Sequence, residues 1–170
     1  GWSLNRFSSV MPVVPMFHAS AWGIPYAATM AGCKLVLPGS KLDGASLYEL
    51  ISQENVDGMC GVPTIWQLLL DYLNQNRLTL ATVERTIVGG AAVPLSMIKE
   101  FDQKHNVFVM HGWGMTEVSP VGTVNYKTPE MMELSRDKQY QLQLKQGKPL
   151  LGLTMRIVND AGENQPFDGV

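Results

Sequence analysis

The order of segments along residues 10–114 predicts an α/β fold in which a mostly parallel sheet is flanked by helices. Short apolar runs rich in Val alternate with longer segments whose apolar residues recur at helical spacing. Gly and Pro stand at most of the boundaries between them, where the chain has to turn. Such alternation is typical of parallel sheets, because a crossover is needed to return each strand to the same direction.

The first half of the chain is predicted to hold three strands and three helices. Residues 19–31 are small and apolar nearly all round, which predicts one buried helix ending at Gly32. Asp43 is placed to begin the next helix, over residues 45–54. The other predicted elements here are strands at 10–17, 34–37 and 56–62 and a helix at 65–73.

The second half continues the alternation as far as residue 114. A strand at 86–88 ends in the turn Gly89-Gly90-Ala91-Ala92, and a helix opened by Pro94 and Ser96 follows. The apolar run 107–110 predicts a buried strand that closes on a Gly-rich turn.

After Pro129 the composition changes. Residues 130–146 are rich in Glu, Gln, Lys and Arg, which predicts a solvated helix or a loosely held excursion. Residues 153–158 alternate as in a strand, and Asn-Asp-Ala-Gly at 159–162 predicts a hairpin turn. We therefore expect an α/β subdomain at 1–126, a polar helical excursion at 127–149 and the start of a truncated β-rich subdomain at 150–170.

Three strand exits carry distinctive chemistry: Phe17-His18, the 89–92 turn and the stretch 111–117. Parallel sheets bind ligands beyond the carboxyl ends of their strands, so these exits predict a site at one edge. In the third exit, glycines flank Trp113, which offers an aromatic face. Thr116 and Glu117 follow, a hydroxyl and a carboxylate suited to a phosphate oxygen and Mg²⁺. The alternative is a strand-to-loop turn whose Trp packs and whose Thr and Glu cap a helix.

The composition excludes several classes of protein. Of the 170 residues, 45% are hydrophobic and 16% charged, with a net charge of −2, so there is no electrostatic case for nucleic acid. Cys33 and Cys60 are too few for a disulfide framework, and no apolar run approaches the ~20 residues that span a bilayer. We expect a cytoplasmic protein. The missing initial Met and the turn-like end at 166–170 lead us to expect a segment of a longer chain.

Five stretches resemble the adenylate-forming acyl-CoA synthetases, and among them the medium- and long-chain fatty-acyl-CoA ligases. They occur in the order and spacing of that family and cover nearly the whole chain. These stretches are Val14 to His18, Ala31 to Gly39, Gly61 to Trp66, Gly89 to Pro94 and Gly112 to Glu117. The resemblance implies the central subdomain of the large domain of such an enzyme.

The family joins a carboxylic acid to ATP, giving an acyl-adenylate and pyrophosphate, and then transfers the acyl group to CoA. The resemblance thus implies a small-molecule carboxylic acid, ATP, Mg²⁺ and CoA as ligands. It also implies contacts with the remainder of the parent chain, and it allows a homodimer and peripheral membrane association.

The resemblance assigns roles to residues of the three exits. Trp113 would stack on adenine, with the 89–92 turn on the other side, while Thr116 would bind phosphate and Glu117 would bind Mg²⁺. His18 would lie near the reacting carboxylate. The nucleotide-binding set implied is Gly90, Ala91, Ala92, Gly112, Trp113, Gly114, Met115 and Thr116, and the acyl-pocket set is His18, Trp22, Gly89 and Met115.

Each role has a simpler alternative. His18 can be a hydrogen-bonded core histidine, and Trp22, which would line and gate an acyl tunnel, can be a packing residue. We expect Trp66 to pack in the core. His105 and His111 lack metal-ligand spacing, so we expect surface or turn positions for them.

Parts of the family's site fall outside the 170 residues: a Gly/Ser/Thr-rich phosphate loop with its lysine upstream, and a ribose-binding aspartate and a C-terminal lysine downstream. Losing one electrostatic contact of this kind costs about 10²–10³ in rate. We therefore expect that the chain alone does not turn over. Two other functions stay open: a ligase for an aryl or short thioether acid, or an oxidative light emitter; and a non-catalytic nucleotide- or acyl-binding module.

Overall fold

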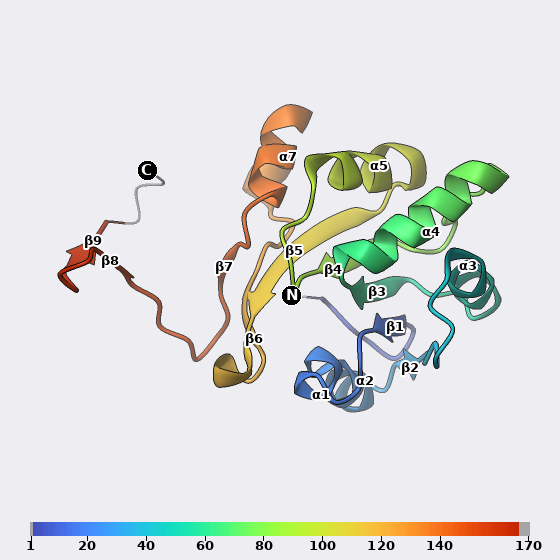
Figure 1. The fold of residues 1–170 in the computed structure, drawn as a ribbon, viewed down its shortest axis with the longest axis horizontal. Helices are drawn as coiled ribbons and strands as arrows, with labels where there is room; N and C mark the ends of the chain where they lie inside the picture. Colours follow the sequence, from blue (N-terminus) through green and yellow to red (C-terminus); the bar gives the residue numbers. More distant parts are fainter. Residues whose placement is uncertain (1, 167–170) are drawn as a thin grey trace.

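The computed structural model describes residues 2–166 and consists of one large sheet with helices on both faces (Figure 1). The large sheet has the strand order β2-β1-β3-β4-β5-β6-β7. Its strands are β1 (Ser9–Val13), β2 (Lys34–Leu35), β3 (Gly58–Gly61), β4 (Arg85–Val88), β5 (Phe108–Gly114), β6 (Val121–Val124) and β7 (Lys148–Pro149). The first five run parallel, and β6 and β7 are antiparallel additions at one edge. The predicted mostly parallel α/β sheet is confirmed.

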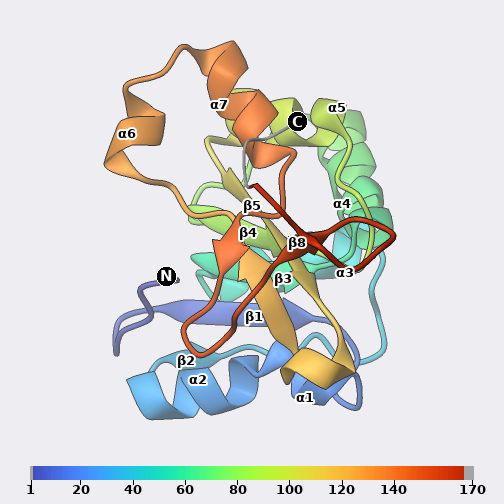
Figure 2. The ribbon, with the colours of Figure 1, turned by 90° about the vertical axis from the view of Figure 1, so that its left-hand side faces the viewer.

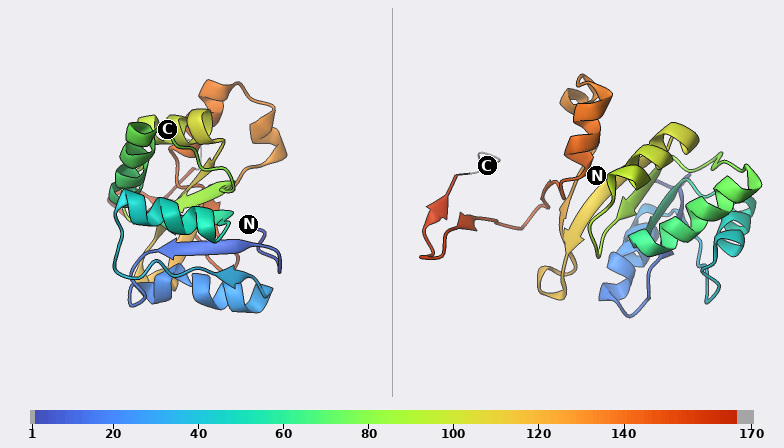
Figure 3. Two further views of the ribbon diagram at one scale, coloured as in Figure 1. Left: turned by 90° about the vertical axis from the view of Figure 1, so that its right-hand side faces the viewer. Right: turned by 45° about the horizontal axis from the view of Figure 1, so that its top comes forward.

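The helices follow the strands in the predicted alternation. They are α1 (Ala19–Trp22), α2 (Ile24–Ala31), α3 (Gly44–Gln53), α4 (Pro63–Asn76), α5 (Leu95–His105), α6 (Pro129–Met132) and α7 (Arg136–Gln143), with a short 3₁₀ turn η1 (Thr116–Val118). A two-stranded hairpin, β8 (Ile157–Val158) and β9 (Asn164–Gln165), lies away from the sheet (Figure 3, right). Within residues 2–166, no helix has the length and apolar character needed to cross a membrane. The turn expected over residues 167–170 lies outside the described residues.

The sheet separates two apolar layers because neighbouring strand residues point to opposite faces. Met11 of β1 packs in the larger layer with α3, α4 and α5, which stand in front of the sheet in Figure 3, left. Val10 packs in the smaller layer with Ile24 and Ala28 of α2 and the buried Cys60. Burial raises the pKa of the Cys60 thiol to about 12, so this cysteine is a protonated core residue.

The helix predicted over 19–31 is wrong in two respects. It is broken into α1 and α2 at Gly23, and Pro25 lies in the first turn of α2, where its lack of an N–H costs nothing. The second helix is also buried on one side only, because Tyr26 is 64% and Met30 89% exposed. Small apolar composition therefore concealed both the break and the exposed face.

The polar stretch after residue 129 is held more firmly than predicted. Helix α7 buries Gln139, Tyr140 and Gln143 and packs against α5. The Tyr140 hydroxyl donates a 2.6 Å hydrogen bond to Asp102, and the Gln139 amide donates to the carbonyl of Leu134 at 2.8 Å. Glutamines can be buried where their amides find backbone partners, which a reading of polarity alone does not reveal.

The predicted surface or turn positions of His105 and His111 are also wrong. His105, at the end of α5, is 7% exposed, and its ring nitrogens have no hydrogen-bond partner among residues 2–166. His111, in the middle of β5, is 2% exposed. Burial lowers the pKa of both imidazoles, so both are neutral at pH 7. Trp66, by contrast, is fully buried in the core as expected.

Candidate functional site

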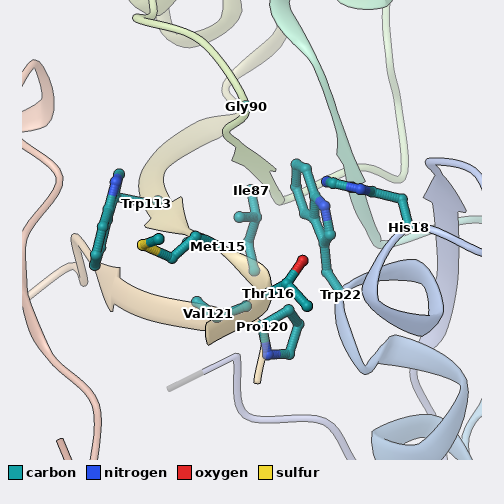
Figure 4. A pocket seen from close by; sticks show the side chains of 11 residues that line it. His18, Trp22, Ile87, Gly90, Trp113, Met115, Thr116, Pro120 and Val121 are labelled. Carbon is teal, nitrogen blue, oxygen red and sulfur yellow. The ribbon is translucent and has the colours of Figure 1, made fainter. Parts of the chain in front are cut away.

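A pocket lies where β1, β4 and β5 end, at the carboxyl edge of the parallel strands (Figure 4). All three predicted strand exits contribute to it. It is lined by His18, Trp22, Ile87, Gly90, Gly112, Trp113, Gly114, Met115, Thr116, Pro120 and Val121. Eight of the twelve residues assigned by resemblance therefore line one pocket, and the other four, Gly89, Ala91, Ala92 and Glu117, lie beside it.

Trp22 enters the pocket from an unusual stretch of backbone. Ala21, Trp22 and Gly23 have consecutive φ values of 51°, 57° and 74°, in the left-handed region that non-Gly residues rarely adopt. The indole of Trp22 lies beside His18 in Figure 4. A backbone of this kind costs free energy and persists where the surroundings hold it, often at functional positions.

Gly89 lets Trp22 and β5 meet. A Cβ atom on Gly89 would lie 3.4 Å from the Trp22 ring and 3.0 Å from the carbonyl oxygen of Gly112. Gly89 is buried behind the pocket and not in its lining. It thus brings the Trp22 indole and the β5 backbone together by having no side chain.

The strand β5 continues through the motif predicted as a turn. His111 to Gly114 belong to β5, and Gly112 and Trp113 pair with Val124 and Thr123 of β6. The register shifts between Trp113 and Gly114, and the chain turns only afterwards. The Gly-rich turn predicted directly after residue 110 is therefore wrong, because the second strand of a hairpin supplies partners for the backbone there.

The ring of Trp113 is packed on one side and open on the other. It lies over Gly122, where a Cβ atom would overlap the indole. Even so, Trp113 is 39% exposed, and Figure 4 shows it on the far side of Met115 from Trp22 and His18. A flat aromatic face, fixed from behind and open in front, can stack on a planar ligand.

Thr116 and Glu117 lie on η1, directly after this strand. Thr116 lines the pocket, while Glu117 is exposed and makes no ion pair within the described part of the chain. Residues 2–166 hold no group of three or more His, Cys, Asp or Glu that could form a metal cage. A single free carboxylate fits Mg²⁺ of the kind that keeps waters and binds through substrate phosphates.

Sequence reasoning missed three residues of the lining, Ile87, Pro120 and Val121. Ile87 could have been found from strand alternation, since it points opposite to Thr86 and Val88 on β4. Pro120 and Val121 carry no comparable signal, because they reach the pocket only through the antiparallel return of β6.

His111 connects the pocket's backbone to more distant elements. Its Nδ1 lies 2.9 Å from the carbonyl oxygen of Leu144, just beyond α7, and because a carbonyl only accepts, Nδ1 carries the proton. Burial lowers the pKa of this imidazole, and backbone groups of Leu144, Ala91 and Gln143 partly oppose that shift. The ring therefore lies between the 89–92 turn and the end of α7.

The fold and pocket define an α/β protein with a pocket at the edge where its parallel strands end, and sequence comparison identifies the family. A family model described as "AMP-binding enzyme" matches residues 2–170. The chain belongs to the family of AMP-binding enzymes.

Similar proteins include several acid–CoA ligases. A medium-chain-fatty-acid–CoA ligase of Ectopseudomonas oleovorans is 48% identical over 98% of this chain and 31% of its own length. A 3-methylmercaptopropionyl-CoA ligase of Ruegeria lacuscaerulensis is 47% identical over 95% of the chain and 30% of its length. A long-chain-fatty-acid–CoA ligase of Thermus thermophilus is 43% identical over 99% of this chain and 31% of its own length. The chain thus spans about 30% of the curated relatives that it matches.

Solved structures share the fold. The N-terminal domain of FACL13 from Mycobacterium tuberculosis has a TM-score of 0.79 at 23% identity, over 96% of this chain and 39% of that one. A long-chain-fatty-acid–CoA ligase, FadD1, from Archaeoglobus fulgidus has a TM-score of 0.77 at 18% identity, over 95% of this chain and 32% of that one.

The two glycines of the motif should respond differently to alanine. In Gly114→Ala the new Cβ would overlap the carbonyl oxygen of Pro120, whereas in Gly112→Ala the nearest atoms are 3.5 Å away. We expect Gly114→Ala to lower the free energy of unfolding by about 1–3 kcal/mol and Gly112→Ala to change it by less than about 1 kcal/mol. Urea unfolding measures both, and equal midpoints for the two variants would contradict the packing argument.

Proposed function

We propose that the full-length protein is an ATP-dependent acid–CoA ligase that activates a fatty acid as its acyl-adenylate and transfers the acyl group to CoA. The observation that carries this proposal is the joining of two kinds of chemistry in one pocket. Trp22, Ile87 and Val121 give one part an apolar lining, while Trp113 and Thr116 give another part an aromatic face and a hydroxyl. The names of the medium- and long-chain relatives support the same reaction.

Nucleotide binding would use the open side of the pocket. The exposed face of Trp113 would stack on adenine, with Gly90, Ala91 and Ala92 on the other side of the base. Thr116 would donate its hydroxyl hydrogen to a phosphate oxygen. Glu117 would hold Mg²⁺, which supplies charge neutralisation at the phosphates when bound. Adenylation depends mainly on placement and charge stabilisation, which are the properties these residues offer.

The acid would enter from the side of Trp22. The apolar surface formed by Trp22, Ile87 and Met115 would contact the alkyl tail, with His18 beside the carboxylate. The strained backbone at Trp22 suits a side chain that has to occupy one defined position at the mouth of an acyl tunnel. CoA would receive the acyl group, and the parent chain would complete the site. We expect the protein to lie in the cytoplasm. A mass measurement in solution would test whether it forms a homodimer.

The second candidate is a ligase for a short thioether acid. It is favoured by the 47% identity to a 3-methylmercaptopropionyl-CoA ligase, nearly equal to that of the medium-chain enzyme. Acid length separates the two candidates, since burying each additional methylene contributes about 0.8 kcal/mol only where an apolar tunnel receives it.

Trp22→Ala should change acid preference. In the full-length protein we expect kcat/KM to rise with chain length up to a medium or long acid, and the variant to shift that optimum, because a tunnel wall is removed. Rates across straight-chain acids and 3-methylmercaptopropionate measure this, with Trp66→Phe as the packing control. A wild-type optimum at the thioether acid would support the second candidate instead.

Glu117→Gln should abolish activation without unfolding the protein. The amide removes the negative charge but keeps the shape, and Glu117 is exposed with no ion pair in the described segment. We expect acid-dependent pyrophosphate exchange in the full-length protein to fall by about 10²–10³ while thermal stability is unchanged. Glu133→Gln, also exposed, is the control. An unchanged exchange rate would show that the metal assignment is wrong.

The 170-residue chain alone should not catalyse exchange. Thr116 and Glu117 are open to water, so charge stabilisation at these groups is weak in the isolated segment. We expect flat pyrophosphate exchange by the segment and acid-dependent exchange by the full-length protein at equal concentration. Robust exchange by the segment would refute this expectation.

A further inference from the structure

A second groove meets the exposed face of Trp113, apart from the pocket of Figure 4. It is lined by Trp113, Thr123, Leu144, Lys145, Gln146, Gly147 and Met155. One wall is therefore the segment 144–147, which follows α7 and returns the chain to β7. Among the residues that line this groove, Trp113 alone has a role in the proposed reaction. The position of the segment 144–147 beside the indole therefore needs its own explanation.

Two buried polar side chains hold this segment. His111 donates from Nδ1 to the carbonyl of Leu144 at 2.9 Å. Asn125, at the end of β6, donates from its amide to the carbonyls of Leu142 and Lys145, the second at 2.9 Å. The last carbonyls of a helix have no partner within it, and these side chains pair with the carbonyls of Leu144 and Lys145. At Leu142, Asn125 adds a second donor to a carbonyl that also accepts from the N–H of Lys145.

His111 and Asn125 are hydrogen-bonded to each other, and His111 also interacts with the 89–92 turn. The backbone N–H of Asn125 donates to the carbonyl of His111 at 2.9 Å, and the His111 ring also interacts with the backbone of Ala91. Both side chains are at least nine-tenths buried. Gly147 fits closely against β6, because a Cβ atom there would overlap the Val124 carbonyl oxygen. The segment is thus held at Leu144, Lys145 and Gly147 against β5, which carries Trp113, and against β6.

We propose that His111 and Asn125 are positioning residues that fix the segment 144–147 as a second wall beside Trp113, so that nucleotide affinity depends on them. This inference rests on the proposed function, in which the Trp113 face binds the adenine nucleotide. Neither side chain lines the pocket or the groove; both act through the carbonyls of the segment. Outer-shell hydrogen bonds that hold metal ligands in place typically carry an effect of about 10–100-fold, and we expect an effect of similar size here.

The test compares variants of the full-length protein. We expect Asn125→Leu and His111→Leu each to raise the KM for ATP about tenfold while kcat and the KM for the acid change less than about threefold. His111→Asn should restore near wild-type values, since the Asn amide can donate from about the position of Nδ1. Tyr140→Phe is the matched control, because it loosens α7 through the Asp102 contact and leaves the carbonyls of 142–145 paired.

Limited trypsin digestion gives a readout independent of activity. Lys145 lies in the segment and is exposed, so release of the segment should speed cleavage after Lys145 in Asn125→Leu and His111→Leu but not in Tyr140→Phe. AMP should slow this cleavage in the wild type. Two results would overturn the inference while leaving the proposed function intact. One is a tenfold fall in kcat of the two Leu variants with an unchanged KM for ATP. The other is an unchanged rate of cleavage after Lys145 in both variants. A wild type with no exchange for any acid and no protection by AMP would overturn both.

Discussion

The whole site depends on one row of strand pairing. Val13, Gly61, Val88 and His111 are paired across β1, β3, β4 and β5. Because parallel ladders bind each strand to its neighbours at a fixed register, this row aligns the ends of β1, β3 and β4, while β5 continues to Gly114. Figure 2 shows these strands side by side. The exits at residues 18, 90 and 113 can therefore line one pocket. A slip of one residue would turn the pocket-facing side chains toward α3, α4 and α5.

A second constraint is the placing of each indole on a glycine. Trp2 lies over Gly58, Trp66 over Gly61, Trp22 beside Gly89 and Trp113 over Gly122, and these are all four tryptophans of the chain. A missing Cβ leaves a flat area on a strand, and an indole fills it with a large contact area. The same solution that packs Trp66 in the core holds Trp22 and Trp113 at the pocket, so site and core share one packing rule.

The regular elements could be predicted, and the exceptions share a physical cause. Helix α4 repeats apolar residues at helical spacing, and β3 is a short run that is buried at every position, so local pattern and burial agree. The buried face of α7 and the burial of His111 depend instead on partners on other elements. Tyr140 and His111 are buried where the Asp102 carboxylate and the Leu144 carbonyl accept their hydrogens, and no local pattern encodes those acceptors. The three strand exits, with Trp113, Thr116 and Glu117, could be named from the residues, whereas the place of Trp22 in the site came from the family resemblance.

The residues proposed to bind the nucleotide and those proposed to bind the alkyl tail differ in their exposure to water. Trp113, Thr116 and Glu117 are all open to water, whereas Trp22 is partly covered and Ile87 is half-buried. An apolar wall keeps its preference for an alkyl tail even when it is partly wet, since the hydrophobic effect needs only the contact area. A hydroxyl or carboxylate, however, acts strongly on developing charge only where water is excluded. In the proposed function, the apolar part of the pocket would therefore bind an alkyl tail as it stands, while Thr116 and Glu117 would act strongly only when a further surface covers them.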